Sequence, residues 1–346
     1  MESDELFIKF CRDRNIKDST MKGYRSSLLK YSLFTGCSLS QLINEANEDE
    51  YKRIPLKNRR IKKHLMDYRN YLFDSELSQT TIKTYFSKLI TFYKHYEIEI
   101  PHLPNVQYEK EYETNYLDLP TKNHIKQALD ICELPFKALI LFMASSGTAK
   151  AETLSLSVDD FISACSEYYN STTLEDILFD LSLRDDIVPT IYLKRIKTDK
   201  YYYTFCSTEA SKYIIKYLRQ RKNLKLKDRL FPFSGSLVMN KFQEINDKLE
   251  WGFKGKYRFF RTHTLRKFHA SNIQLSSEYV DALQGRSKSK VHETYIKTNP
   301  SNLKKIYMEN MKNILIYDEL NEKKDTDEDI HITINVFLSD EQINLY

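Results

Sequence analysis

Glycine and proline are scarce in this chain of 346 residues, which contains seven of the first and eight of the second. Few positions therefore interrupt a helix, so long helices are favoured over β-sandwiches and over phosphate-cradling loops. The G-x-x-x-x-G-K-[ST] motif is absent, and so are G-x-G-x-x-G and G-x-S-x-G. The absence of the first motif argues against nucleotide hydrolysis, and we expect no bound nucleotide.

The cysteines and histidines do not form a recognisable metal or disulfide pattern. The five cysteines are odd in number and never spaced as C-x-x-C, and the eight histidines form neither H-x-x-x-H nor H-E-x-x-H. We therefore expect packing cysteines in a reducing compartment, and neither a metal nor a cofactor. No run of about 18 apolar residues could span a membrane, and the acidic start Met-Glu-Ser-Asp-Glu is unlike a signal peptide. We expect a cytoplasmic protein without a membrane partner.

The net charge of +5 is distributed unevenly along the chain. Residues 318–346 contain nine acidic side chains against Lys323 and Lys324, a net charge of −7. Subtracting this −7 from the total leaves +12 on residues 1–317, a surplus that suits a polyanion such as nucleic acid. A well-solvated basic surface explains the same surplus equally well.

The spacing of apolar residues predicts a helical first domain over residues 1–100. Apolar residues recur every three or four positions after polar helix starts, in segments that begin near Asp18, Leu56 and Ser78. The aromatic residues are mostly core, although interleaved Lys and Arg could contact phosphates. Residues 101–118 lack this periodicity and contain Pro101 and Pro104, which predicts a linker.

A second domain is predicted over residues 119–317. It is mainly helical, with a small β-hairpin whose strands lie near Ile191 and Tyr201, joined by the basic segment 194–200. The polar segment 163–186 is expected to be an insertion and not core. In the acidic tail, residues 318–346, apolar residues alternate from Ile330 to Leu338 as in a half-buried strand.

The second domain carries an ordered set of motifs. His263 and Arg266 form H-x-x-R, Gly285-Arg286 follows, Tyr295 stands nine residues beyond Arg286, and Lys197 lies earlier on the predicted hairpin. Their order and spacing resemble the tyrosine recombinases of the lambda-integrase family, and the first domain resembles the family's core-binding domain. The sequence Leu-Gln-Gly-Arg at 283–286 is similar to the corresponding motif in integrases of archaeal viruses and plasmids. Each motif alone is weak, so the resemblance depends on the complete set.

One position departs from the family pattern. The family's first catalytic arginine lies in T-G-x-R-x-x-E, which here reads Ser146 to Glu152 and places Ala149 at the arginine position. Lys150 is adjacent but points about 100° away on a helix, so it is a poor substitute. Either an arginine was replaced to disarm the enzyme or the chain is a naturally degenerate member. The intact remaining positions favour the first alternative.

The resemblance implies a two-domain clamp around double-stranded DNA, acting as a homo-tetramer at a specific recombination site. Tyr295 would attack the scissile phosphate and form a 3'-phosphotyrosyl bond, and Lys197 would protonate the leaving oxygen. His263 would assist proton transfer, Arg266 and Arg286 would hold the phosphate oxygens, and Glu152 would support the site. With Ala149 present, we expect DNA binding to persist and cleavage to be impaired.

Other functions remain open on the sequence. A type IB topoisomerase would use similar chemistry, although the helical first domain and the spacing fit integrases better. A non-catalytic DNA-binding relative would keep the fold and only occupy its site. The tail is equally compatible with docking on a neighbouring protomer and with packing on its own chain.

Overall fold

The computed structural model describes residues 4–107, 112, 115–286 and 299–317. The chain forms two compact units, Met1–Tyr112 and Glu113–Tyr346, each with its own apolar core. The predicted nucleophile Tyr295 and the strand-like segment Ile330 to Leu338 lie outside the described residues. Within the described residues, no helix is long and apolar enough to cross a membrane.

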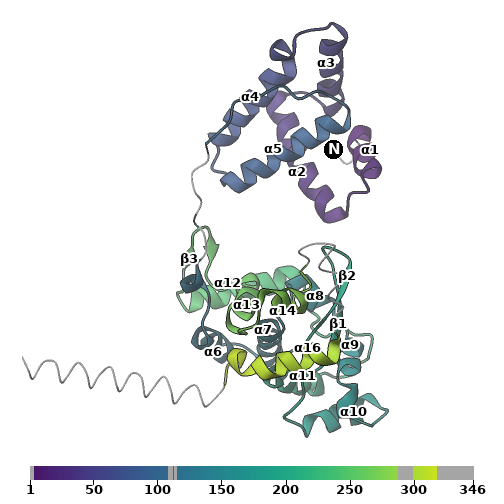
Figure 1. Cartoon of the computed structure of the whole chain (residues 1–346), viewed down its shortest axis with the longest axis vertical. Helices are drawn as coiled ribbons and strands as arrows, with labels where there is room; N and C mark the ends of the chain where they lie inside the picture. The colour runs from purple at the N-terminus through teal and green to yellow at the C-terminus, as the bar shows by residue number, and fades with distance from the viewer. Residues whose placement is uncertain (1–3, 108–111, 113–114, 287–298, 318–346) are drawn as a thin grey trace, which may run out of the picture. The chain divides into compact units, whose positions relative to one another are not determined.

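The first unit is a small bundle of helices (Figure 1). α2 packs against α4 and α5, and α3 packs against α4. Aromatic side chains fill much of its core; the hydroxyl groups of Tyr31 and Tyr93 share a buried hydrogen bond of 3.0 Å. The aromatic residues of this unit are therefore largely core, as predicted. The elements are α1 (Glu5–Asp13), α2 (Asp18–Thr35), α3 (Leu39–Tyr51), η1 (Leu56–Asn58), α4 (Arg60–Phe73) and α5 (Gln79–His95).

The second unit is mainly helical, as expected, and contains the predicted hairpin and a second short antiparallel hairpin that was not predicted. Its helices are α6 (Lys122–Asp130), α7 (Leu134–Ser146), α8 (Lys150–Ser155), α9 (Val158–Ala164), α10 (Leu174–Ser182), α11 (Thr208–Gln220), α12 (Gly235–Lys248), α13 (Thr262–Asn272), α14 (Ser277–Leu283) and α16 (Pro300–Asn310). Short 3₁₀ turns are η2 (Tyr116–Asp118), η3 (Ser166–Tyr168) and η4 (Met311–Ile314). The strands are β1 (Ile191–Arg195), β2 (Lys200–Thr204), β3 (Phe253–Lys254) and β4 (Tyr257–Arg258).

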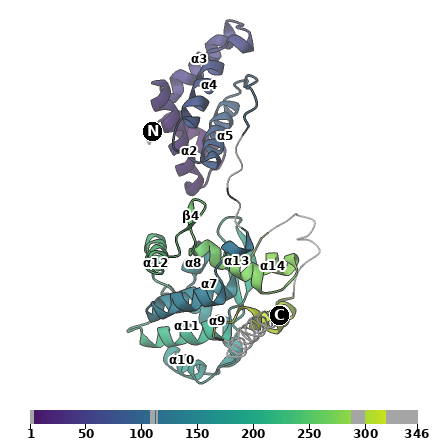
Figure 2. The same cartoon turned by 90° about the vertical axis from the view of Figure 1, so that its left-hand side faces the viewer.

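Helix α7 is the centre of this unit. Its residues from Ala138 to Ser146 are all buried, as expected for a segment that is apolar on every face. It packs against α11 and α13, and Figure 2 shows α11 running beside it. Pro135 lies in its first turn, where a missing N–H costs nothing, and Gly147 ends it in the left-handed conformation at φ 64°. The chain then turns directly into α8.

The predicted hairpin forms between β1 and β2, with Ile191 paired to Thr204 and Arg195 to Lys200. Side chains alternate along β1: Ile191 and Leu193 are buried, whereas Tyr192 and Lys194 are exposed. Arg195 continues the inward-facing set at the end of the strand. The hairpin therefore presents one arginine to the body of the unit.

The expectation that segment 163–186 is an insertion outside the core was wrong. Residues Leu174–Ser182 form α10, which packs on α11 and buries Ile177, Leu178 and Leu181 in the main core. These three residues lie within four positions of one another, so they line one face of a helix. The acidic and hydroxyl side chains between them occupy its other faces, which made the segment look polar in the sequence.

Candidate active site

Arg266 is the most buried arginine of the predicted set, and α13 carries it. Its Nη1 donates a hydrogen bond of 2.6 Å to the carbonyl oxygen of Gly147, and its Nη2 donates one of 2.7 Å to that of Gln284. Burial lowers the pKa of its guanidinium, although nearby Glu152 opposes this effect. One side chain thus joins the end of α7 to the turn after α14, across 119 and 18 residues of sequence.

Glu152 is the buried carboxylate beside Arg266. Its Oε2 accepts hydrogen bonds from the backbone N–H of Ala149 at 3.1 Å and from the hydroxyl group of Tyr202 at 3.0 Å. The same oxygen lies 3.9 Å from Arg266 Nη1, and Oε1 lies 4.0 Å from Arg195 Nε. A buried charge is stable only when it is paired and hydrogen-bonded, and Glu152 meets both conditions. Glu152 thus lies between two arginines and two hydrogen-bond donors.

The turn after α14 holds Gly285 and Arg286. Gly285 has φ 60°, and a Cβ there would lie 2.6 Å from a ring carbon of Tyr202, so only glycine fits. Arg286 is exposed, and its guanidinium lies 3.9 Å from the carboxylate of Asp281. This geometry explains why glycine precedes the arginine: strand β2 packs directly on the turn.

His263 lies in the first turn of α13 and remains exposed. Surrounding protein atoms nevertheless lower its pKa below the usual value, and the cations Arg261, Lys267, Arg266 and Arg286 lower it further. A hollow of about 370 Å³ beside it is lined by both basic and aromatic side chains, among them Lys150, Phe253, Tyr257 and Arg261. The lowered pKa favours the neutral imidazole, which can accept a proton.

A second histidine, His269, contacts Gln284 in the turn that Arg266 binds, although the sequence motifs did not identify it. It is completely buried, its Nδ1 lies 3.0 Å from Gln284 Nε2, and burial lowers its pKa to about 3. A Cβ on Gly147 would lie 2.6 Å from this ring nitrogen. His269 stands three residues after Arg266, so the helical period that linked His263 to Arg266 could also have identified it.

Ala149 lies at the start of α8, where its N–H caps onto Glu152. Lys150 does not replace the absent arginine at this carboxylate, because its Nζ donates a 3.0 Å hydrogen bond to the carbonyl oxygen of Gly235 at the start of α12. This contact agrees with the divergence expected from its helical position. The lysine next to Ala149 is thus directed to α12 and not to Glu152.

Lys197 is exposed on the turn of the β1–β2 hairpin. Arg195, two residues earlier, reaches the cluster instead: its Nη1 donates hydrogen bonds to the carbonyl oxygens of Gly285 and Gln284. Sequence reasoning missed Arg195 because it considered the basic hairpin only for its lysines. The alternation of buried and exposed residues along β1 was the signal that could have identified it.

The structure thus gathers Glu152, Arg266 and the Gly285-Arg286 turn, and leaves Lys197 on an exposed turn. Among the described residues, no three His, Cys, Asp or Glu side chains lie close enough together to hold a metal ion.

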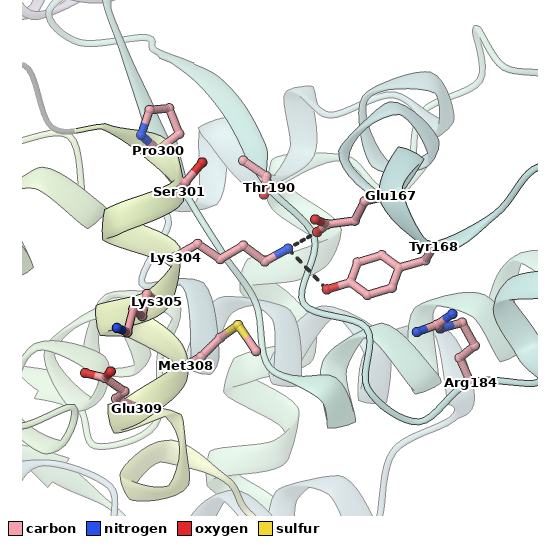
Figure 3. A pocket seen from close by; sticks show the side chains of 10 residues that line it. All are labelled: Glu167, Tyr168, Arg184, Thr190, Pro300, Ser301, Lys304, Lys305, Met308 and Glu309. Carbon is pink, nitrogen blue, oxygen red and sulfur yellow. Dashed lines mark hydrogen bonds and ion pairs between the residues drawn. The ribbon is translucent and has the colours of Figure 1, made fainter.

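A larger hollow of about 750 Å³ is lined by none of the cluster residues (Figure 3). There Lys304 pairs with Glu167 and with the hydroxyl group of Tyr168. The cluster, not this hollow, is the candidate active site.

No protein-family model and no curated protein sequence matches this chain. Among solved structures, a lambda integrase dimer bound to a COC' core site aligns with a TM-score of 0.51 and 14% identity, covering 84% of this chain and 96% of that one. The Tn1549 transposon integrase in complex with transposon right end DNA aligns at 0.48 and 13%, covering 88% and 98%. XerH recombinase bound to difH substrate aligns at 0.47 and 17%, covering 86% and 82%.

Of these three, the lambda integrase alignment has the highest TM-score, and at 14% identity it concerns the fold and not the chemistry. The alignment covers most of this chain, whose second unit is mainly helical with small hairpins. It therefore confirms the resemblance predicted from the order of the motifs. The chain has the fold of the tyrosine recombinases represented by lambda integrase.

Proposed function

We propose that this protein is a site-specific DNA recombinase that cuts and rejoins DNA through a 3'-phosphotyrosyl intermediate. The observation that carries the proposal is the pair of hydrogen bonds from Arg266 to Gly147 and Gln284. They bring the H-x-x-R helix, the position of the first arginine and the Gly285-Arg286 turn to one place. Arginine, with its fixed fork of donors, is suited to phosphate oxygens.

The reaction that these residues would perform balances without a cofactor. The hydroxyl oxygen of Tyr295 forms a bond to phosphorus while the bond from phosphorus to the 5'-oxygen breaks. Neutral His263 takes up the phenolic proton, and Lys197 gives a proton to the leaving oxygen. Arg266 and Arg286 neutralise the charge that develops on the non-bridging oxygens. Attack by another 5'-hydroxyl reverses the step and joins a new strand.

Ala149 weakens this scheme at one point. Loss of a single preorganised donor typically lowers a rate about 10² to 10³-fold. DNA affinity is distributed over many phosphate contacts and therefore changes little. The protein is thus a recombinase that binds its site and cleaves it slowly.

The partner is double-stranded DNA carrying a specific site, and the active assembly is a homo-tetramer of paired protomers. The lambda integrase structure, a dimer bound to a core site, supports both the DNA partner and the pairing of protomers. The five free cysteines suit a reducing compartment, so the protein would act in the cytoplasm of a cell that hosts a mobile element.

A covalent-adduct assay tests the proposal. The binding site is first selected from a pool of random DNA duplexes, and a nicked suicide duplex of that sequence is then incubated with protein. We expect a DNA-linked band on a denaturing gel that grows about 10² to 10³-fold faster with Ala149→Arg and disappears with Tyr295→Phe. An adduct that persists in Tyr295→Phe would exclude Tyr295 as the nucleophile.

Ala149 also favours a second candidate, a catalytically degenerate DNA-binding protein of the same fold. The same assay separates the two functions, because a degenerate protein would bind the selected duplex and form no adduct. Tight binding without an adduct, even after Ala149→Arg, would establish this alternative and overturn the proposed chemistry.

A further inference from the structure

Arg195 is the arginine of β1 that faces the candidate active site. We propose that its guanidinium takes over part of the role of the arginine absent at position 149, by contacting the non-bridging oxygens of the scissile phosphate beside Arg266. This inference rests on the proposed recombinase function and names a further catalytic residue for it.

Arg195 shares its partners with Arg266. Arg195 and Arg266 both donate to the carbonyl oxygen of Gln284, and both lie about one ion-pair distance from the carboxylate of Glu152, at 4.0 and 3.9 Å. Two guanidinium groups are therefore held side by side against one carboxylate. The pKa of Arg266 is lowered partly by the charge of Arg195, as expected for neighbouring cations.

Arg195 and Ala149 also approach the same carboxylate. The N–H of Ala149 donates to Oε2 of Glu152, and Arg195 approaches Oε1 of the same group. An arginine at position 149 would have its backbone N–H bound to this carboxylate. Arg195 approaches the same carboxylate from β1. Arg195 thus provides a second cation at the carboxylate that lies next to position 149.

The side chain of Arg195 is partly accessible: it is 18% exposed, between the 7% of Arg266 and the 39% of Arg286. Three arginines stand near Glu152 and Asp281, so the cluster carries more positive than negative charge and is suited to an anion.

The other nearby cations bind different partners. Lys150 donates to Gly235, and Lys194 faces the opposite side of the strand, where it pairs with Asp199 at 3.3 Å. Arg261 stacks on Tyr257, with its guanidinium carbon 4.3 Å from the ring centre. Arg195 is therefore the best placed of these side chains.

A double-mutant cycle tests the proposal with the selected suicide duplex. Arg195→Ala is made in the chain that carries Ala149 and in the Ala149→Arg variant. If Arg195 compensates for the missing arginine, its loss lowers the rate of adduct formation about 100-fold in the chain with Ala149 and less than about 10-fold in the Ala149→Arg background. Arg184→Ala, which removes an exposed arginine paired with Asp186, is the matched control and should leave the rate unchanged.

A structural role gives a different result. If Arg195 only anchors the Gln284–Gly285 turn, Arg195→Ala lowers the rate equally in both backgrounds, and the proposal is wrong. Arg195→Lys and thermal unfolding of every variant detect loss of the fold. Absence of a Tyr295-dependent adduct in all proteins would overturn the proposed function and this inference together, whereas equal losses would overturn only the inference.

A modified substrate provides an independent readout. A methylphosphonate at the scissile position replaces one charged non-bridging oxygen with a methyl group, so a guanidinium that neutralises this charge is less needed. We expect the penalty of Arg195→Ala to shrink at least about 10-fold on this substrate. An unchanged penalty would place Arg195 away from the phosphate and contradict the proposal.

Discussion

The hydroxyl group of Tyr202 donates a 3.0 Å hydrogen bond to the buried carboxylate of Glu152. Burial raises the pKa of this tyrosine well above its usual value, and the charge of Glu152 raises it further. The phenol therefore stays protonated and acts as a permanent donor. Through it, strand β2 holds the carboxylate beside which two arginines lie.

Tyr202→Phe should destabilise the second unit by about 1 to 3 kcal/mol, because it leaves a buried carboxylate with one donor fewer. Trp251, the single tryptophan, lies in this unit and packs on Phe260, so its fluorescence follows the unfolding of this unit in urea. Tyr201→Phe, on the exposed face of the same strand, is the control and should change stability little. Equal effects of the two substitutions would contradict the role given to Tyr202.

Gly147→Ala should lower the free energy of unfolding of the second unit more than Gly252→Ala does. Both glycines have positive φ, 64° and 63°, so each alanine incurs the left-handed strain of about 1 to 2 kcal/mol. At Gly147 the new Cβ would also meet His269 at 2.6 Å, whereas nothing lies within 4 Å at Gly252. Urea unfolding of both variants checks the difference. If Gly252→Ala is as costly, the contact with His269 is not the cause.

His269 should make the second unit sensitive to acid. Its pKa is about 3 in the folded unit and about 6.5 in an unfolded chain, so the unfolded state binds more protons between these values. Stability is complete above about pH 6.5 and falls as the pH decreases towards 3, with a slope of at most about 1.4 kcal/mol per pH unit. His269→Asn retains an acceptor for Gln284 and should flatten this slope between about pH 6.5 and 4.5. A slope unchanged by the substitution would assign the acid sensitivity to other groups.

Lys197→Ala should lower the rate of adduct formation about 10² to 10⁴-fold, the usual contribution of a general acid. The exposed turn on which Lys197 lies leaves it available to DNA, whereas Lys194 pairs with Asp199 on the same hairpin. Lys194→Ala is therefore the comparison and should have a small effect. A duplex in which sulfur replaces the leaving oxygen needs no acid, so it should restore cleavage by Lys197→Ala. Failure of the sulfur substrate to do so would remove Lys197 from this role.

Much of the fold followed from local patterns. The period of apolar residues predicted α2, α4 and α5 of the first unit and the mainly helical second unit, because this periodicity arises from backbone geometry alone. Two short runs of strand-forming residues predicted the β1–β2 hairpin, whereas α1, α3 and α10 were not predicted. Segment 163–186 was misjudged since its polar residues outnumber the three buried ones that make α10 part of the core. Local composition does not report which face of a helix is covered.

The candidate site also has residues that the sequence identified and contacts that only the tertiary structure revealed. Motif order and spacing in the sequence determined His263, Arg266, Gly285-Arg286 and the replacement of arginine by Ala149, since those depend only on residue identity along the chain. Tertiary structure alone decided that Arg195 from β1 reaches Glu152 and the Gln284 carbonyl oxygen, and that Lys150 turns to Gly235. These contacts join residues 43, 89 and 85 positions apart, and only the packing of α8, α12, α14 and the hairpin brings such distant residues together.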